Sequence, residues 1–325
     1  MKLSVLMLAY NHESYIQQAI ESVMMQKTNF DFDLIIGEDY SKDKTRKIIR
    51  NLKKKYPKKI RLVLHSKNVG VTKNLIEVAK RCTGEYIAFL EGDDFWTDKN
   101  KLQKMVNFLD KNKAYIAACH DVNIINEKGE YIKEQGGYKK SLISPEDQVK
   151  YNNIYLLSLV FRNIWEKDYY LILTRLLKNI NMIADYPLKL LLLNYGKIKY
   201  FPEKMGTYRL ITNSGFSFST LSKKNSLNTI YDRMYGFENL YNFKTAYSKF
   251  FKKWYLREKS IIIWRLLLIK QFKEINHFYK NNIIKDSLMD KIEIFIYLFI
   301  FPLENIAKCP KMLLRVHKTK RNAYE

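Results

Sequence analysis

Tyr86-Ile-Ala-Phe-Leu-Glu-Gly-Asp-Asp94 joins an uninterrupted apolar run to a turn with three carboxylates in four residues. An apolar run of this length predicts a buried strand, so the carboxylates follow its carboxyl end directly. Carboxylates this close repel one another unless a cation lies between them. Hard cations such as Mg²⁺ or Mn²⁺ take oxygen ligands, often shared with phosphates. The turn therefore predicts a metal–diphosphate site, with a solvated acidic loop or the cap of the next helix as the alternative.

Strands alternate with helices around this segment. We expect strands at 3–9, 32–37, 60–64 and 86–90, and helices at 13–25, 43–56, 73–80 and 98–111. This alternation predicts an α/β fold with a mainly parallel sheet and helices on both faces. Parallel strands bring their carboxyl ends to one edge, where ligands bind. Tyr10-Asn11, Glu38-Asp39 and the acidic turn 91–94 all follow such strands, so they are expected to converge there.

Several short segments follow one another in a definite order over residues 2–216. They are Ser4-Val-Leu-Met-Leu-Ala-Tyr-Asn11, Leu34-Ile-Ile-Gly-Glu-Asp-Tyr-Ser-Lys-Asp-Lys-Thr45, Asn68-Val-Gly70, Gly84-Glu-Tyr-Ile-Ala-Phe-Leu-Glu-Gly-Asp-Asp94, Ala184-Asp-Tyr-Pro-Leu188, Gly196-Lys-Ile-Lys-Tyr200 and Met205-Gly-Thr-Tyr-Arg209. Together they resemble the inverting family 2 glycosyltransferases of bacterial surface-polysaccharide synthesis. The resemblance implies a GT-A (Rossmann-like) catalytic domain at 1–220, with a nucleotide half at about 1–112 and an acceptor half at about 113–220.

The resemblance implies a nucleotide-sugar donor, and Asp39 favours UDP because it matches the carboxylate that contacts the base. Ala9, Tyr10 and Asn11 occupy the first-strand nucleotide motif, where relatives usually have threonine in place of Ala9. Tyr10 would lie against the base, since aromatic faces stack on bases. Glu13 is expected near the base or ribose.

The resemblance also assigns the metal and the catalytic base. Asp93 would face the ribose and the metal, and Asp94 the metal, which is Mn²⁺ or Mg²⁺; Glu91 replaces the usual first aspartate of the motif. Asp185 matches the general base of inverting members, which removes the proton of the acceptor hydroxyl. From the residues alone, Asp185 could equally cap a helix at 188–193.

The acceptor is expected to be a glycan or a lipid-linked hydroxyl. Tyr186 resembles the aromatic residue that sets acceptor geometry, and Ser158 lies in a segment, 152–162, that resembles the acceptor-facing strand. Arg209 and the loop Thr212-Asn-Ser-Gly215 match a region that in relatives approaches the diphosphate.

The formal net charge of the 325 residues is +24. Residues 221–325 contain 21 Lys and Arg against 9 Asp and Glu, interleaved with aromatic and aliphatic residues. This interleaving of basic residues with aromatic and aliphatic ones predicts a helical carboxyl-terminal region. It favours either docking on an anionic membrane surface or packing on the catalytic domain or another subunit. We expect a cytoplasmic protein, peripheral at the inner face of the plasma membrane if the region docks there, since its three cysteines form no disulfide framework.

The sequence thus predicts an inverting, metal-dependent glycosyltransferase. The alternative is a basic protein that binds nucleic acid or a membrane surface through a degenerate, non-catalytic GT-A domain. Acidic clusters at the strand ends oppose nucleic-acid binding, because they repel phosphates unless a metal is present. A nucleotidyltransferase would usually have a glycine-rich, basic loop after the first strand, and residues 9–13 contain neither glycine nor lysine.

Overall fold

The computed structural model describes residues 1–134, 141–152, 154–164, 169–180, 185–211, 226–268 and 271–308. The chain divides into two compact units, Met1–Ser226 and Leu227–Glu325. The predicted loop Thr212–Gly215 lies outside the described residues.

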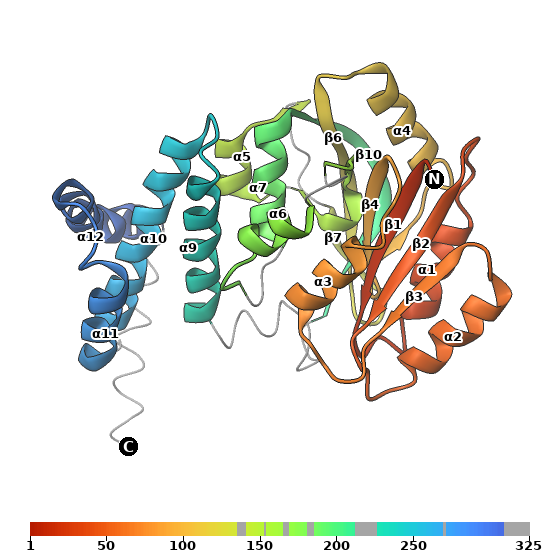
Figure 1. Cartoon of the computed structure of the whole chain (residues 1–325), viewed down its shortest axis with the longest axis horizontal. Helices are drawn as coiled ribbons and strands as arrows, with labels where there is room; N and C mark the ends of the chain where they lie inside the picture. Colours follow the sequence, from red (N-terminus) through yellow and green to blue (C-terminus); the bar gives the residue numbers. More distant parts are fainter. Residues whose placement is uncertain are drawn as a thin grey trace. The chain divides into compact units, whose positions relative to one another are not determined.

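The first unit is built on a sheet whose described strands run in the order β3-β2-β1-β4-β9-β6-β10-β5 (Figure 1). Their bounds are β1 Leu3–Ala9, β2 Phe32–Glu38, β3 Ile60–Leu64, β4 Tyr86–Glu91, β5 Phe95–Trp96, β6 Tyr115–Asn126, β9 Val160–Arg162 and β10 Lys197–Leu210, with β7 Tyr131–Glu134 paired to β6 and β8 Leu142–Ile143 paired to β10. The strands β3, β2, β1 and β4 run parallel to one another, and β6 and β10 run parallel to each other. The short β9 is antiparallel to both β4 and β6 and joins the two halves.

Helices cover both faces of this sheet. The helices α1 Ile16–Met24, α2 Thr45–Lys55 and α4 Lys101–Lys111 share one core with alternate residues of β1 and β2. On the other face, Gly37 of β2 faces Asn74 and Val78 of α3 Val71–Ala79. The later part of the first unit adds α5 Pro145–Tyr151, the 3₁₀ turn η1 Leu156–Ser158, α6 Tyr169–Leu176 and α7 Asp185–Tyr195. Because both faces are covered, β1, β2 and β4 are buried along almost their whole length, and most of their residues are apolar.

The predicted α/β fold with a mainly parallel sheet and flanking helices is confirmed. The first helix begins at Ile16 and not at 13, because the backbone of residues 11–13 bonds to side chains of residues 41–45. In the segment 152–162, expected as one strand, the described residues form the 3₁₀ turn η1 and then the three-residue β9.

The described part of the second unit is helical, as expected for the carboxyl-terminal region. They are α9 Ser226–Asn242, α10 Ser248–Leu268, α11 Phe272–Asn282 and α12 Leu288–Lys308. Apolar residues from these helices form one core. Lys259 is buried within it and donates to both carboxylate oxygens of Asp286, at 2.8 and 2.7 Å. Among the described residues, no helix is both long enough and apolar enough to cross a bilayer.

Candidate active site

The carboxyl ends of β1, β2 and β4 lie at one edge of the sheet, which brings the polar clusters together. The register pairs Ala9 with Glu38 and Leu8 with Glu91. Two backbone hydrogen bonds continue this alignment into the loops: Asp39 N donates to Ala9 O, and Gly92 N donates to Leu8 O, both at 3.0 Å. The predicted convergence of the three clusters follows from this strand order.

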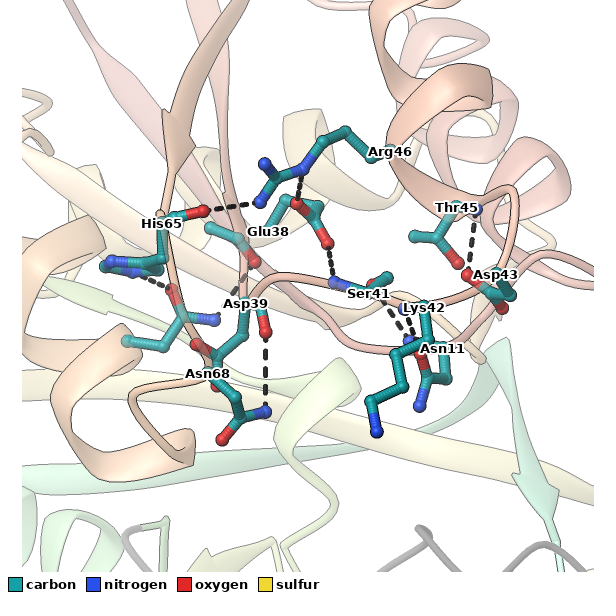
Figure 2. A network of polar contacts seen from close by, with 12 residues as sticks. Asn11, Glu38, Asp39, Ser41, Lys42, Asp43, Thr45, Arg46, His65 and Asn68 are labelled. Carbon is teal, nitrogen blue, oxygen red and sulfur yellow. Dashed lines mark hydrogen bonds and ion pairs between the residues drawn. The ribbon is translucent and has the colours of Figure 1, made fainter.

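The loop after β1 is held by the loop that precedes α2 (Figure 2). Asn11 Oδ1 accepts a hydrogen bond from Lys42 N at 2.9 Å, and Asn11 N donates to Ser41 Oγ at 3.0 Å. Glu13 Oε2 accepts from Lys44 N at 2.9 Å. Asn11 has a positive φ of 55°, which asparagine tolerates better than most residues. Asn11 and Glu13 therefore shape the edge of the predicted nucleotide site.

Asp39 connects the end of β2 to the start of α3. Its two carboxylate oxygens accept from Val69 N at 2.7 Å and Gly70 N at 2.9 Å, and the side chain is buried. Asn68 Nδ2 donates to the Asp39 carbonyl at 3.3 Å (Figure 2). Each carboxylate oxygen has a further lone pair and can accept a second hydrogen bond. Asp39 thus organises the 68–70 loop as well as being the predicted base contact.

The neighbouring Glu38 is fully buried and pairs with Arg46 of α2, and its other oxygen accepts from Ser41 N at 2.6 Å. Arg46 also donates to the His65 carbonyl at 2.6 Å and lies 5.4 Å from the ring centre of Tyr40. Tyr40 has a φ of 60°, which is strained for a bulky residue. These contacts hold the turn after β2 in a fixed shape.

Ala9 is buried at the end of β1, and Tyr10 after it is partly exposed. Ala9 acts through its backbone, because its carbonyl accepts from Asp39 N. Tyr10 lies at the strand edge, where an aromatic face can meet a base. The nucleotide roles of both residues stay predictions.

The acidic turn after β4 is closely packed against β1. A Cβ at Gly92 would lie 2.6 Å from His12 Nδ1 and 3.1 Å from Leu8 O, so only glycine fits there. Asp93 is partly exposed, and its Oδ2 lies 3.9 Å from His12 Nε2. The close approach of the turn to β1 fixes where the two following carboxylates point.

Asp94 is 1% exposed, and its two carboxylate oxygens differ in their hydrogen bonding. Its Oδ1 accepts from Arg209 N of β10 at 2.8 Å, whereas no described residue offers a hydrogen bond to its Oδ2. Burial, and then the charges of Asp93 and Glu91, hold the pKa of Asp94 well above its ordinary value. Burial also raises the pKa of Glu91 to about 8, with a further contribution from Asp93. The turn therefore gathers more negative charge than its surroundings stabilise.

Asp185 is the first residue of α7 and acts on the same turn. Its negative charge adds to the raised pKa of Glu91, and the positive charge of Lys189 opposes that rise. Lys189 Nζ donates to Asp185 Oδ2 at 2.7 Å and to the Ile154 carbonyl at 3.0 Å. Lys189 is 2% exposed, so its ammonium group has a fixed place and holds the Asp185 carboxylate in position. The predicted base and the predicted metal ligands thus lie within electrostatic reach of one another.

Arg209 makes several contacts behind the acidic turn. Its Nε donates to the Asp93 carbonyl at 3.1 Å, its Nη2 donates to Gln18 Oε1 at 3.0 Å, and its guanidinium carbon lies 4.5 Å from the ring centre of Tyr15. These contacts, with the backbone bond to Asp94, make it a support of the turn. Its contact with a diphosphate stays a prediction.

The two residues predicted to contact the acceptor are both buried. Ser158 donates its hydroxyl to the Tyr155 carbonyl at 2.6 Å inside η1, and Tyr186 is 7% exposed in the first turn of α7. Their acceptor roles stay predictions.

Comparison with known proteins identifies the family. Residues 4–175, slightly more than half of the chain, match the family described as glycosyl transferase family 2. The protein belongs to this family. The predicted resemblance is thereby confirmed.

Relatives and solved structures agree with this assignment. An uncharacterized protein of Mycobacterium tuberculosis, Rv1520, is 39% identical over 127 residues, which are 39% of this chain and 37% of the relative. An uncharacterized glycosyltransferase of Nostoc sp., alr2836, is 33% identical over 126 residues, 39% of this chain and 38% of the relative. The matched part thus spans well under half the length of these relatives.

The crystal structure of S. aureus TarS 1-349 in complex with UDP has a TM-score of 0.54 and 16% identity, covering 90% of this chain and 77% of that one. The complex of the same TarS fragment with UDP-GlcNAc has a TM-score of 0.52 and 17% identity, covering 81% of each chain. At this identity the likeness shows the GT-A-like fold alone.

The structure of this family 2 glycosyltransferase tests whether a divalent cation fits the acidic turn. No group of three or more His, Cys, Asp and Glu side chains within the described ranges is arranged to hold a metal by itself. However, the free Oδ2 of buried Asp94 and the partly exposed Asp93 supply oxygen ligands, and a Mg²⁺ or Mn²⁺ site ordinarily completes its shell with water and phosphate oxygens. The residues present therefore fit a cation that arrives with a diphosphate.

Sequence reasoning missed three residues of this glycosyltransferase site. Lys189 lies four residues after Asp185 on α7, and that i,i+4 spacing of opposite charges was the signal available. Tyr155 and Tyr208 have ring centres 5.0 Å apart, and burial together with the charge of Asp94 raises the pKa of both hydroxyls. No sequence signal pairs the two tyrosines, because they are far apart in the chain.

Proposed function

We propose that this enzyme is an inverting, divalent-metal-dependent glycosyltransferase that moves a sugar from a UDP-sugar to a hydroxyl of a glycan or lipid-linked acceptor. One observation carries the proposal: the carboxylates after β4 and the first residue of α7 act on one another electrostatically, although about 90 residues separate them in sequence. Asp94 has a buried carboxylate oxygen without a hydrogen bond from a described residue, which suits a cation bound to a diphosphate leaving group. The Asp185 carboxylate, held by Lys189, suits an attacking hydroxyl.

Three features support a nucleotide-sugar donor. Asp39 has free lone pairs for a base N–H, and Tyr10 offers an aromatic face at the same edge. The TarS fragment, which shares the fold, was crystallised with UDP and with UDP-GlcNAc. We infer from these features that UDP is the nucleotide of the donor.

We propose that Asp94 and Asp93 hold Mn²⁺ or Mg²⁺. The cation would offset the charge of the nucleoside diphosphate as it leaves. The raised pKa values of Asp94 and Glu91 support this assignment, because a nearby cation would lower both and remove the mutual repulsion.

We propose that Asp185 is the general base. The acceptor oxygen attacks the anomeric carbon, its proton passes to the Asp185 carboxylate, and the bond from that carbon to the diphosphate oxygen breaks on the opposite side, which inverts the configuration. Lys189 supports this role because it holds one Asp185 oxygen at 2.7 Å and leaves the other available. The carboxylate is 36% exposed, so an acceptor hydroxyl has access to it.

We further propose that residues 1–220 form the catalytic domain and that transfer takes place in the cytoplasm. Cys82 and Cys119 are free, buried thiols, which is typical of proteins in a reducing compartment.

The proposal is tested by thermal shift with UDP, GDP, dTDP and CMP, each with and without Mn²⁺. A ligand that binds only the folded state stabilises it by about 2.7 kcal/mol at a hundredfold excess over its Kd. We expect a Mn²⁺-dependent shift with UDP that is lost in Asp94→Asn, which keeps an acceptor for Arg209 N but removes the charge. Asp98→Asn, which changes an acid paired with Lys104, is the matched control and should keep the shift.

The base is tested separately. Asp185→Asn should keep the UDP shift but lower donor hydrolysis by about a hundredfold or more. If no nucleotide shifts the folded wild-type protein at millimolar concentration, the donor proposal is wrong. If Asp185→Asn hydrolyses the donor at the wild-type rate, the assignment of the base is wrong.

A further inference from the structure

The first turns of α12 expose an unusual number of large apolar side chains. Leu288, Met289, Ile292, Phe295 and Ile296 are between 44% and 74% exposed. Isolated exposed apolar residues are normal on protein surfaces, but five within nine residues are not. We call these five residues the α12 apolar face.

The spacing of these residues puts them on one side of the helix. At 3.6 residues per turn, their positions fall within about a third of the helix circumference. Ile294 lies on the opposite side, is 3% exposed and belongs to the core of the second unit. The helix α12 therefore packs against its own unit with one side and presents a continuous apolar stripe with the other.

Exposed lysines lie close to α12 in the sequence. Lys273, Lys280 and Lys285 are exposed on α11 and the connection to α12. Of the acids in the same stretch, Asp290 pairs with Lys252 and Asp286 with Lys259, both at 2.7 Å, whereas Glu293 accepts from Tyr297 and Glu274 is exposed. The excess of positive charge is therefore a property of residues 221–325 as a whole.

Two kinds of partner suit an exposed apolar stripe, a second copy of the chain and a lipid surface. Residues 221–325 contain 21 Lys and Arg against 9 Asp and Glu, so two copies would bring like charges together. An anionic bilayer attracts the same charges, at about 1 kcal/mol for each lysine or arginine near the surface. Aliphatic and aromatic side chains on one side of a helix, in a region with an excess of basic residues, match a helix that lies in the lipid interface.

We propose that the α12 apolar face inserts into the surface of an anionic lipid bilayer. The inference narrows the membrane hypothesis for residues 221–325 to five named side chains. It does not depend on the donor or on the base, because none of these residues belongs to the catalytic unit.

The test is co-flotation of the full-length protein with vesicles of phosphatidylglycerol and phosphatidylcholine, and with vesicles of phosphatidylcholine alone. The variant carries Phe295→Glu and Ile296→Glu, both at exposed positions. The control is Ile132→Glu on β7, which changes an equally exposed isoleucine in the first unit. Thermal denaturation and the UDP shift check that each variant is folded.

We expect the wild type and the Ile132→Glu control to bind anionic vesicles and not phosphatidylcholine. The double variant should lose at least about tenfold in its partition coefficient, since each side chain loses its transfer into the apolar layer. Equal binding of the double variant and the wild type, or no vesicle binding by the folded wild type, would overturn the proposal. Self-association of the wild type that the double variant abolishes, without vesicle binding, would assign the face to a second copy instead.

Discussion

Lys101 offers the sharpest test of the physical reasoning, because it is a fully buried amine with no hydrogen-bond partner among the described residues. It is 0% exposed at the start of α4, and no described residue bonds to its Nζ. The nitrogen lies 4.0 Å from the ring centre of Trp96. Burial alone holds the pKa of Lys101 well below its ordinary value of 10.5. The free energy of unfolding should therefore rise when the amine is removed.

We predict that Lys101→Met stabilises the protein by about 1–3 kcal/mol at neutral pH. This is the range that protein variants give for a buried polar group without a hydrogen bond. Methionine keeps the unbranched stem and an apolar contact with the Trp96 ring, so no cavity forms. Lys111→Met, at an exposed position on the same helix, is the control and should change stability by no more than about 0.5 kcal/mol.

The pH dependence of the free energy of unfolding is a second, independent test of the buried amine. Because the pKa of Lys101 is lower in the folded than in the unfolded chain, the unfolded chain binds more protons between those two values. The stability of the wild type therefore rises with pH in that window, by up to about 1.4 kcal/mol per pH unit, and the penalty is complete below it. Lys101→Met should remove this slope.

Urea denaturation between about pH 7 and pH 10 measures both effects. Burial also lowers the pKa of the neighbouring His120, but that group adds no slope above its ordinary value of 6.5. A variant that is less stable than the wild type, or that has the same pH slope, would refute the reasoning about the buried amine.

Two further variants test the fold and the site. Gly84→Ala should destabilise the protein by about 1–3 kcal/mol, because a Cβ there would lie 2.4 Å from Ser4 N in the central strand; an unchanged urea midpoint would contradict this close approach. Lys189→Met should lower donor hydrolysis by about ten- to a hundredfold while leaving the UDP thermal shift intact, because Asp185 loses its fixed position. It should also raise the pKa of Glu91 above about 8, since the Lys189 charge lowers it, and a pH–rate profile identical in shape to that of the wild type would show that Lys189 is structural only.

The sequence by itself determined the elements of the nucleotide half. The strand 3–9 has the bounds that were expected, because a buried strand of a parallel sheet reads as a local apolar run. The edge strand 60–64 also has its expected bounds, although it is only partly buried. The order of strands and helices then determined which loops share an edge, so the convergence of Asp39 with the acidic turn followed from topology. Family membership followed from the order and spacing of the same segments.

The bounds of the helices, and the elements after residue 112, were harder to predict from the sequence. The first helix starts three residues later than its apolar pattern suggests, because Asn11 and Glu13 bond to the loop before α2. The local pattern of apolar residues carries no information about a hydrogen bond to residues about 30 positions away. The segment 152–162 turned out to be mostly irregular because its short β9 owes its place to pairing with β4 and β6.

The electrostatic state of the site was decided by the tertiary structure alone. A carboxylate, an amine and an imidazole look the same in sequence whether they are solvated or buried. Only the fold leaves Asp94 Oδ2 and Lys101 Nζ without partners among the described residues, and only the fold brings Lys189 and Asp185 to bear on Glu91. The physical reason is that desolvation and Coulomb interactions depend on distance in space, whereas the strand and helix patterns depend on distance along the chain.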